Sequence, residues 1–430
     1  MKRRTLKPIN KPLNGSINIP GDKSISHRAV ILGSLAKGTT RITNFLTSDD
    51  CMHTISTFRK LGVFIDQNDT SIKIKSKGHL SLTEAKEPLY FGNSGTTARL
   101  LIGLLASLPL FSTIYGDPYL TERPMARVVN PLRRMGAEIY GRNNGELLPI
   151  AIQGQRLSGI TYPLPVKSAQ VKSALLLAGL FANGKTTVVE KAITRDHTER
   201  MLRAFGAKLT IDDLTVTIER TNELKGTEIY VPGDISSAAF FLVAGAIVRN
   251  SNITLRQVGL NPTRTGIVDV MKRMGANLSL HNEQQRNFEP FGDITVQATS
   301  LKATTIEGDL IPRLIDEIPI IALLATQAEG TTVIKDAAEL RVKETDRIRA
   351  VVEVLQALGA NIEETEDVMI INGPTPLKGA NVSAYYDHRM AMMIAIASLI
   401  AKGNVTIDDD SAINISYPQF FDHLNALIQS

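Results

Sequence analysis

The sequence predicts an α/β protein made of six copies of one helix-turn-strand unit, arranged as two domains of three units each. Two recurring phrases and the length of the chain support this prediction. The first phrase is an apolar residue, then Gly, usually followed by Ala, then a strand with alternating polar and apolar residues. It occurs as LGVFI from Leu61, MGAEI from Met135, FGAKL from Phe205, MGANL from Met274 and LGANI from Leu358.

The second phrase is the end of a helix, a turn and a strand rich in β-branched residues, and it alternates with the first. It occurs as AKGTTRIT near Gly38, SLPLFSTIYG near Leu110, ANGKTTVV near Gly184, RNSNITL near Asn250, AEGTTVI near Gly330 and AKGNVTI near Gly403. Successive copies lie about 65 to 80 residues apart, so six units of about 70 residues fill the chain. In each unit Gly is expected to end a helix or to form the turn.

The length of 430 residues exceeds the size at which a single core keeps growing, and units this long do not form a solenoid. Two globular domains are therefore expected, with a boundary near Val231-Pro232-Gly233-Asp234. We expect residues 21–232 to form the N-terminal domain, and residues 1–20 together with 233–430 to form the C-terminal domain. The strand that leads up to Pro20-Gly21 is expected to complete the last unit.

Composition indicates an ordinary globular protein. Hydrophobic residues make up 43% of the chain and charged residues 21%, which excludes a disordered chain. The longest apolar run, twelve residues from Met390, is too short to span a membrane. The basic N-terminus has no apolar signal segment, so a cytoplasmic protein is expected. Cys51 is the only cysteine, which excludes an intramolecular disulfide and a cysteine-built metal site. The seven His form no pair at the spacing of metal ligands.

The charge balance favours an anionic partner. The net charge of +5 and the isoelectric point near 9.1 are typical of proteins that bind small anions or nucleic acid. Aromatic residues make up only 5% of the chain, Trp is absent, and no tract is rich in Lys and Arg. Because nucleic-acid bases would then have few side chains on which to stack, a small anionic substrate is the preferred interpretation.

Several units open their helices with cations and small polar residues, a combination that suits anion binding. GDKSISHR supplies Lys23, Ser24 and Arg28; FGNSGTTAR supplies Asn93, Gly95, Thr96 and Arg99; TERPMAR supplies Arg123; VKSAQVK supplies Ser168 and Gln170; and YYDHRM supplies Asp387 as N-cap, followed by Arg389. Each polar residue alone is more typical of an ordinary helix cap. Capping does not need Arg, however, so its recurrence predicts a cleft for a substrate with phosphate and carboxylate groups.

The stretch RVKETDRIR, residues 341–349, holds four cations and two carboxylates ahead of an apolar run at helical spacing. A helix is expected to open here, with Thr345 or Glu344 supplying early hydrogen bonds. Lys343 and Arg347 would then repel each other four residues apart on one face and oppose the helix dipole. These two penalties predict a bound anion, with Glu344 as a candidate proton carrier. The alternative is a solvated, charged helix start.

Asp316 and Glu317 are the main acidic residues near these cations in the predicted arrangement. They stand at the beginning of an apolar helix, where the helix dipole alone favours a carboxylate, so a capping role is an equal alternative. Asp316 paired with Glu344 would supply a base and an acid, with cations keeping the resting carboxylates ionised.

One motif is rejected on its context. GLFANGKT, from Gly179 to Thr186, satisfies the GxxxxGKT pattern of a phosphate-binding loop. That loop requires the order strand, loop, helix, whereas here a helix precedes the motif and a strand follows it. The same turn recurs in other units without the Lys, so nucleotide binding is not expected.

Five motifs together resemble one known family. PGDKSISHRA, GNSGTTARLL, TERPM, RVKETDRIRA and DHRMAM occur in the order typical of 5-enolpyruvylshikimate-3-phosphate synthases, and the resemblance spans nearly the whole chain. It implies a two-domain inside-out α/β barrel of six βαβαββ units, three per domain, with the active site in the cleft between domains. The implied reaction transfers the enolpyruvyl group of phosphoenolpyruvate to the 5-hydroxyl of shikimate 3-phosphate, in the pathway to chorismate and the aromatic amino acids.

The resemblance also implies site residues. Catalytic roles fall on Asp316, Glu344 and Lys23. Shikimate 3-phosphate would be bound by Lys23, Ser24, Arg28, Ser168, Gln170, Asp316 and Lys343, and phosphoenolpyruvate by Lys23, Gly95, Arg123, Gln170, Arg347 and Arg389. The family implies a cytoplasmic monomer that uses no cofactor or metal and binds neither nucleic acid nor membrane.

Some positions depart from the family pattern. Many relatives have Ser where this chain has Ala169, Asn where it has Glu339, and Lys where it has Ile415. Arg195, in TRDHTER, is expected to compensate on the phosphate for Ser and Tyr residues of some relatives. Gly95 favours sensitivity to glyphosate, the family's inhibitor that competes with phosphoenolpyruvate, because an added methyl group would crowd it.

Two rival interpretations follow from the same features. UDP-N-acetylglucosamine enolpyruvyl transferases share the six-unit fold but usually use a loop Cys, whereas Cys51 follows an Asp pair that opens a helix and is expected to be a packing residue. RNA-binding proteins include relatives of this fold and would suit the basic isoelectric point. The absence of interleaved aromatic and basic residues counts against RNA.

Overall fold

The computed structural model describes residues 3–429, which divide into two compact units. The N-terminal unit consists of Gly21–Val231 and the short segment Arg286–Glu289. The C-terminal unit consists of the chain up to Pro20, Pro232–Gln285 and the chain from Pro290 onward. Each unit has its own hydrophobic core. The sequence predicts residues 286–289 in the C-terminal domain, because nothing in their composition distinguishes them from the hairpin that contains them.

The described residues form six sheets, three in each unit, and the repeat predicted from the sequence is confirmed. Two sheets of the N-terminal unit show the plan: β6 pairs in parallel with β7 and β10 with β11, and a hairpin adds antiparallel strands to each. Sheet strands alternate buried and exposed residues, as in β5 (Ser71–Lys77) and β9 (Leu147–Gln153). Each sheet therefore packs one face on a core and exposes the other.

The strands of the N-terminal unit form three sheets. The first contains β3 (Ala36–Thr43), β4 (Phe64–Asn68), β5, β14 (Leu224–Lys225) and β15 (Glu228–Tyr230). The second contains β6 (Leu89–Tyr90), β7 (Phe111–Tyr115), β8 (Glu138–Gly141) and β9, and the third contains β10 (Thr161–Pro163), β11 (Lys185–Val189), β12 (Leu209–Asp212) and β13 (Thr215–Glu219).

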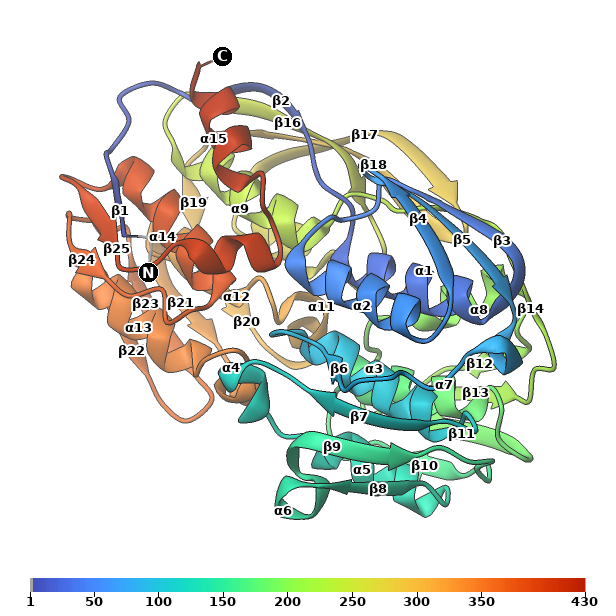
Figure 1. The fold of residues 1–430 in the computed structure, drawn as a ribbon. Helices are drawn as coiled ribbons and strands as arrows, with labels where there is room; N and C mark the ends of the chain where they lie inside the picture. The colour runs from blue at the N-terminus through green and yellow to red at the C-terminus, as the bar shows by residue number, and fades with distance from the viewer. Residues whose placement is uncertain (1–2, 430) are drawn as a thin grey trace. The chain divides into compact units, whose positions relative to one another are not determined.

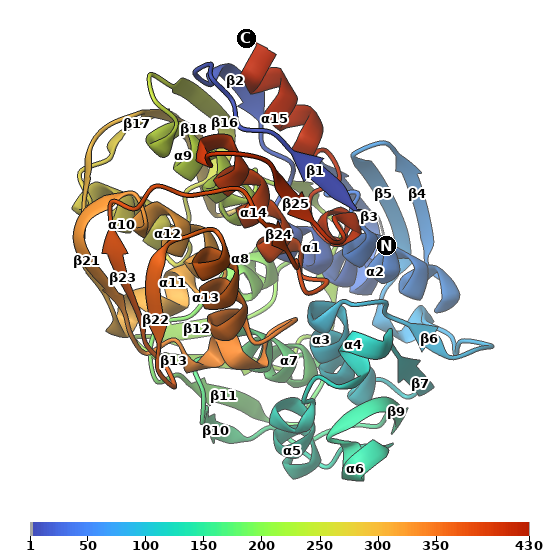
Figure 2. The same cartoon turned by 90° about the vertical axis from the view of Figure 1, so that its left-hand side faces the viewer.

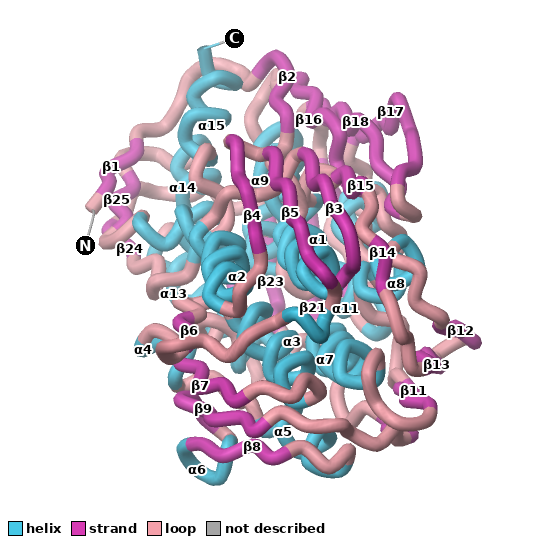
Figure 3. Tube along the Cα trace, turned by 45° about the vertical axis from the view of Figure 1, so that its right-hand side comes forward, coloured by secondary structure: helices cyan, strands magenta, loops and turns pink. Residues whose placement is uncertain are grey.

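Helices of two kinds cover these sheets. One helix of each repeat is apolar on nearly all sides and almost fully buried: α1 (Lys23–Leu35), α3 (Gly95–Ala106) and α7 (Ala169–Gly179). The other is amphipathic: α2 (Asp49–Lys60), α5 (Ala126–Arg134) and α8 (His197–Ala204). The short helices α4 (Pro118–Thr121), α6 (Arg142–Gly145) and η1 (His79–Ser81) lie in connections. Helices α3 and α7 lie side by side (Figure 1), and strands β3 to β5 lie over α1 (Figure 3).

The C-terminal unit repeats this plan with its own strands. Its sheets contain β2 (Asn14–Asn18), β16 (Asn252–Gly259), β17 (Asn277–Arg286) and β18 (Glu289–Gln297); then β19 (Leu301–Lys302), β20 (Thr305–Ile306), β21 (Ala328–Ile334), β22 (Asn361–Glu364) and β23 (Met369–Gly373); and finally β1 (Arg4–Leu6), β24 (Asn381–Val382) and β25 (Val405–Ile407). The chain before α1 thus serves two sheets. β1 pairs with β25 in the last repeat, whereas β2 pairs with β16 in the fourth. The expectation that the strand leading up to Pro20 completes the last unit is therefore wrong for β2, and β1 takes that place.

The central helices of the C-terminal unit are α9 (Ile235–Ile247), α12 (Ile318–Ala325) and α14 (His388–Ile400), which pack on one another. The outer ones are α10 (Gly266–Arg273), α13 (Arg347–Ala357) and α15 (Phe420–Gln429), with α11 (Ile311–Leu314) and the 3-10 turns η2 (Gly308–Leu310), η3 (Ala338–Val342) and η4 (Ser411–Ile415) in connections. Helix α13 lies against β22 and beside α12 (Figure 2). Within residues 3–429, no helix is both long and apolar enough to cross a membrane.

The glycines of the first repeated phrase end the amphipathic helices, as predicted. Gly136 follows α5 with φ of +97°, and Gly206 follows α8 with φ of +87°. This left-handed conformation closes the last helical turn and suits glycine because it lacks Cβ. In the second phrase Asn250 takes the same conformation, with φ of +61°, where four of the other five copies have Gly. These left-handed residues therefore end the helix and lead the chain directly into the next strand.

Candidate active site

The predicted site residues gather where the helices begin. The side chains of Asp22, Ser94 and Ser168 cap α1, α3 and α7, and those of Asp234 and Asp387 cap α9 and α14. Each accepts a hydrogen bond from a backbone N–H of the first turn, which leaves the neighbouring N–H groups and side chains directed at the space before the helix. The sequence predicts the cap at Asp387. It also places Ser168 and Gln170 ahead of a helix; Ser168 is the cap of α7, whereas Gln170 lies inside its first turn.

Arg28 is buried and held at three points in the N-terminal unit. Its Nε donates to Oγ1 of Thr198 at 2.6 Å, its Nη2 to Oγ of Ser173 at 2.8 Å, and its Nη1 to the carbonyl oxygen of Ser24 at 3.0 Å. Thr198 and Ser173 also share a hydrogen bond of 2.6 Å. Arg28, which is predicted to bind the phosphate group, is thus held in place by contacts within the protein. Sequence reasoning missed Thr198 and Ser173, because they lie 170 and 145 residues further along the chain.

Lys23 is the first residue of α1 and forms an ion pair with Asp50. The distance from Lys23 Nζ to Asp50 Oδ2 is 3.1 Å, and both side chains are largely buried. Asp50 belongs to the acidic first turn of α2, where the helix dipole favours a carboxylate. The Asp pair before Cys51 is the sequence signal for this partner. Cys51 itself is fully buried in the core, as predicted, and burial raises the pKa of its thiol, with Asp50 adding to the effect.

Gln170 links the first turns of α7 and α3. Its Oε1 accepts a hydrogen bond from Arg99 Nη1 at 2.7 Å, and its Nε2 donates to Thr96 Oγ1 at 3.1 Å. Arg123, in the loop between α4 and α5, packs over the start of α3. A Cβ built on Gly95 would lie 2.9 Å from the Cζ and both Nη atoms of that guanidinium. A methyl group at residue 95 would therefore displace the guanidinium of Arg123, so glycine is required for this packing.

A buried ion cluster supports the segment that holds Arg28. The ammonium group of Lys172 lies 2.9 Å from Glu190 Oε2 and 2.6 Å from Glu199 Oε1, and all three side chains are at most 5% exposed. Lys172 also donates to the carbonyl oxygen of Thr194. Burial opposes the charge of Lys172, but Glu199 and Glu190 outweigh it and raise its pKa. The cluster ties α7 to residues 190–199, which include Arg195 and Thr198.

Lys172→Met should therefore destabilise the protein by about 3–5 kcal/mol, because it leaves two buried carboxylates without a cation. Denaturation midpoints in urea measure this change. Lys185→Met is the matched control, since it breaks the exposed pair with Glu219 and should barely move the midpoint. Neutralising the carboxylates, in Lys172→Met/Glu190→Gln/Glu199→Gln, should recover much of the loss. Equal midpoints for the two single variants would contradict the argument.

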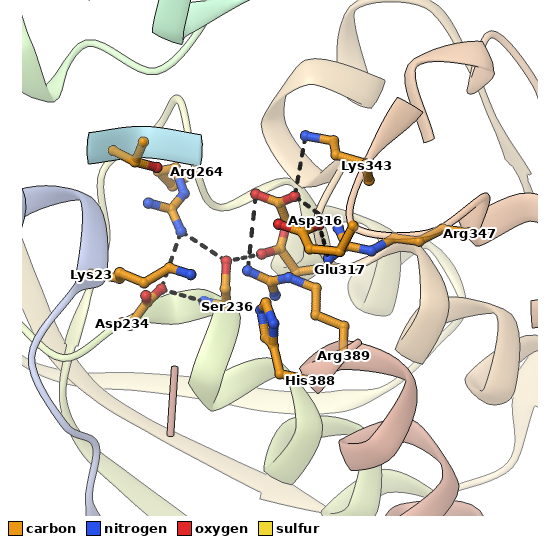
Figure 4. Close-up of polar contacts among 12 residues, drawn as sticks. Lys23, Asp234, Ser236, Arg264, Asp316, Glu317, Lys343, Arg347, His388 and Arg389 are labelled. Carbon is orange, nitrogen blue, oxygen red and sulfur yellow. Dashed lines mark hydrogen bonds and ion pairs between the residues drawn. The ribbon is translucent and has the colours of Figure 1, made fainter. Parts of the chain in front are cut away.

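In the C-terminal unit, three cations from separate elements surround the carboxylate of Asp316 (Figure 4). Its Oδ1 lies 3.3 Å from Arg347 Nη1 and 3.4 Å from Lys343 Nζ, and its Oδ2 lies 3.9 Å from Arg389 Nη2. Asp316 and Glu317 precede α12, as expected. Burial, opposed by Asp316 and reinforced by Arg347, lowers the pKa of Lys343. We call Asp316, Lys343, Glu344, Arg347, Asp387 and Arg389 the Asp316 cluster.

Arg347 is the centre of the Asp316 cluster and only 1% of its side chain is exposed. It binds Asp387 through two nitrogens, at 2.7 Å from Nε to Oδ2 and 3.2 Å from Nη2 to Oδ1. Its Nη2 also lies 2.6 Å from Glu344 Oε2. Burial disfavours its charge, but Asp387 and Glu344 outweigh burial and raise its pKa further. Asp387, which also caps α14 at Arg389 N, therefore joins α14 to α13.

The predicted start of this helix is wrong. α13 begins at Arg347, and its cap is Asp346, which accepts from Arg349 N at 3.1 Å. Lys343 follows the turn η3 in an extended conformation, so Lys343 and Arg347 do not share a helix face and Thr345 and Glu344 do not cap. Asp is the better cap, and Arg341 holds Asp346 in place at 2.8 Å. The anion-binding argument therefore rests on Asp316, which brings both cations together.

A second buried network lies beside this cluster, and it was not predicted from the sequence. Arg264, just before α10, donates through Nη2 to Asp234 Oδ1 at 3.1 Å and to Ser236 Oγ at 2.8 Å, and Ser236 donates to Glu317 (Figure 4). The network joins the N-termini of α9 and α12. A sequence signal exists, because PGDIS at residues 232–236 repeats PGDKS at residues 20–24.

Two positions that depart from the family pattern have structural explanations. Ala169 is the first residue of α7 after the capping Ser168, a position that needs no side-chain hydrogen bond. Ile415 ends the η4 turn and is buried, so it packs rather than carries charge. Among the described residues, no group of His, Cys, Asp and Glu is arranged to hold a metal ion.

Comparisons with known proteins find relatives that match nearly the whole chain. The family model described as EPSP synthase (3-phosphoshikimate 1-carboxyvinyltransferase) matches residues 8–424. A 3-phosphoshikimate 1-carboxyvinyltransferase of Bacillus pumilus is 57% identical over 97% of this chain and 98% of its own, and one of Bacillus cytotoxicus is 58% identical over the same shares.

Among solved structures, the EPSP synthase of Acinetobacter baumannii aligns with a TM-score of 0.88 and 41% identity, covering 99% of this chain and 98% of its own. The enolpyruvyl transferase NikO of Streptomyces tendae, at 18% identity and a TM-score of 0.77, covers 98% of this chain and 96% of its own and shares the fold. The expected fold class, a two-domain inside-out α/β barrel, is thereby confirmed. The family model covers residues 8–424, and the two Bacillus enzymes are 57% and 58% identical to this chain over nearly its whole length. The chain therefore belongs to the EPSP synthase family.

Proposed function

We propose that the basic groups at the helix starts of both units act on the same two substrates, with Asp316 as the central reacting group. The protein transfers the enolpyruvyl group of phosphoenolpyruvate to the 5-hydroxyl of shikimate 3-phosphate and releases phosphate, a step of the shikimate pathway. The observation that carries the proposal for the site is the Asp316 carboxylate among three cations. A base surrounded by anion-binding groups is what a reaction between two anions needs.

We assign the substrates to the two sets of residues as follows. Shikimate 3-phosphate is bound by Lys23, Ser24, Arg28, Ser168, Gln170, Asp316 and Lys343, and phosphoenolpyruvate by Lys23, Gly95, Arg123, Gln170, Arg347 and Arg389. The fixed geometry of Arg28 supports the first set, and the buried position of Arg347 supports the second. Because these cationic side chains are already held in place, binding of phosphate and carboxylate groups costs little side-chain conformational entropy.

In the proposed mechanism, Asp316 accepts the proton of the 5-hydroxyl as its oxygen attacks C2 of phosphoenolpyruvate. Glu344, with Lys23, delivers a proton to C3, which gives a tetrahedral intermediate. The same groups remove a proton from C3 when the bond to phosphate breaks. The proton gained at C3 is later lost, and the hydroxyl proton accepted by Asp316 passes to the released phosphate or to solvent, which regenerates the base.

The test is release of phosphate by the purified protein. We expect release only when shikimate 3-phosphate and phosphoenolpyruvate are both present, with EDTA in place of added metal, since the proposed chemistry needs no cofactor. The control replaces shikimate 3-phosphate with UDP-N-acetylglucosamine, which should give no phosphate. Turnover of that sugar nucleotide instead would overturn the assignment. We further propose that the protein acts in the cytoplasm as a monomer.

A further inference from the structure

A cavity in the N-terminal unit lies at the opposite ends of the helices that carry the site residues. It has a volume of about 390 Å³, and its lining includes Ser107, the C-cap of α3, and Phe181, just beyond the end of α7. Helix α3 has 12 residues, so its two ends are about 18 Å apart. None of the predicted substrate ligands lines the cavity. It is therefore separate from the groups that bind the substrates.

One wall of the cavity is flat and apolar. The rings of His79 and Phe181 stack with centroids 4.0 Å apart and planes 20° from parallel. Leu80, one of the most exposed large apolar residues at 77%, and Pro109 extend this wall. Burial, with a contribution from Arg220, lowers the pKa of His79, so its ring is neutral near pH 7. The wall thus offers an uncharged surface on which a planar group can pack.

Two arginines supply positive charge to the same cavity. Arg156 and Arg220 both line it, and neither makes a hydrogen bond or ion pair with any residue that the structure describes. The carboxylates nearest to Arg220 in sequence are already engaged. Glu219 lies 2.8 Å from Lys185, and Glu223 lies 3.2 Å from Lys37. A single unpaired surface arginine is ordinary, but two at one cavity with an apolar wall indicate a built site for an anion.

We infer that this cavity is a second ligand site, for a small carboxylate with a flat apolar ring. The volume suits one such molecule. The C-terminal carbonyl groups of α3 and α7 disfavour negative charge at the base of the cavity, so the carboxylate faces Arg156 and Arg220 while the ring packs on the wall of His79, Leu80 and Pro109. Thr221 and Asn222, also in the lining, provide polar groups beside the carboxylate.

The experiment uses 4-fluorobenzoate as the probe and the full-length protein, with binding followed by fluorine NMR. We expect saturable binding, with a shift of the His79 ring signals at the same probe concentrations. Arg156→Gln/Arg220→Gln should weaken binding by about tenfold or more, because charge-assisted hydrogen bonds are lost. Phe181→Leu should also weaken binding, because it removes the ring on which His79 stacks and so loosens that wall.

The matched control is Arg41→Gln/Arg203→Gln, which removes the same charge from exposed positions of the same unit and should leave binding unchanged. The neutral isostere 4-fluorobenzamide should bind more weakly than 4-fluorobenzoate. The cavity variant should keep the wild-type kcat and denaturation midpoint, which shows that it is folded. Equal affinity in the cavity and control variants would overturn the inference, as would displacement of the probe by saturating phosphoenolpyruvate and shikimate 3-phosphate.

Discussion

Arg347→Met should lower kcat/KM by about a thousandfold or more and the free energy of unfolding by about 3–5 kcal/mol. The guanidinium is the shared partner of Asp387, Glu344 and Asp316, and the carboxylate of Asp387 is fully buried. Methionine fills similar volume but leaves these three carboxylates with much less positive charge. Steady-state kinetics and urea denaturation measure the two effects separately.

Arg349→Met is the matched control for this change. Arg349 lies on the same helix, two residues further on, and its pair with Glu353 is exposed on the surface. Exposed i,i+4 pairs contribute little, so both kcat/KM and the denaturation midpoint should stay close to wild type. Arg347→Lys adds a third comparison, because it keeps the charge but loses the two-point contact with Asp387. If Arg347→Met behaved like Arg349→Met, Arg347 would have no central role.

The parts of the fold that the sequence predicts are those specified by local signals. The turn at Gly136 and the cap at Asp387 depend on residues within a few positions of each other, so their patterns reveal them. Because the unit occurs six times, these local patterns recur along the chain and are easier to recognise. The start of α13 was misplaced because Thr345 and Asp346 are adjacent and both can cap a helix, and the contact between Arg341 and Asp346 that favours Asp346 is not visible in the sequence.

The partners of the site residues could not be predicted in the same way. Thr198 is brought to Arg28 from another repeat, and Asp387 is brought to Arg347 by the packing of α14 against α13. Such pairs depend on register between elements that are distant in sequence. The cations were predictable as a set because arginine at a helix start has no capping purpose. Their grouping around Asp316 required the structure.

Glu344→Gln and Asp316→Ala should each lower kcat by about a hundredfold to ten-thousandfold while changing KM far less. Glutamine at position 344 keeps an oxygen for Arg347 but cannot carry a proton. Alanine at position 316 removes the proposed base. It also removes the negative charge that competes with substrate anions for Lys343, Arg347 and Arg389, so substrate binding should hold or tighten.

Glu353→Gln is the matched control, since Glu353 is a surface carboxylate paired with Arg349, and its kcat should match wild type. Wild-type kcat in both Glu344→Gln and Asp316→Ala would remove these residues from the chemistry. Solvent deuterium separates the two proton carriers at C3. If Glu344 delivers the proton, Glu344→Gln should lose deuterium incorporation into the methylene group of phosphoenolpyruvate in proportion to kcat. Incorporation that survives in Glu344→Gln but is lost in Lys23→Met would assign that proton to Lys23.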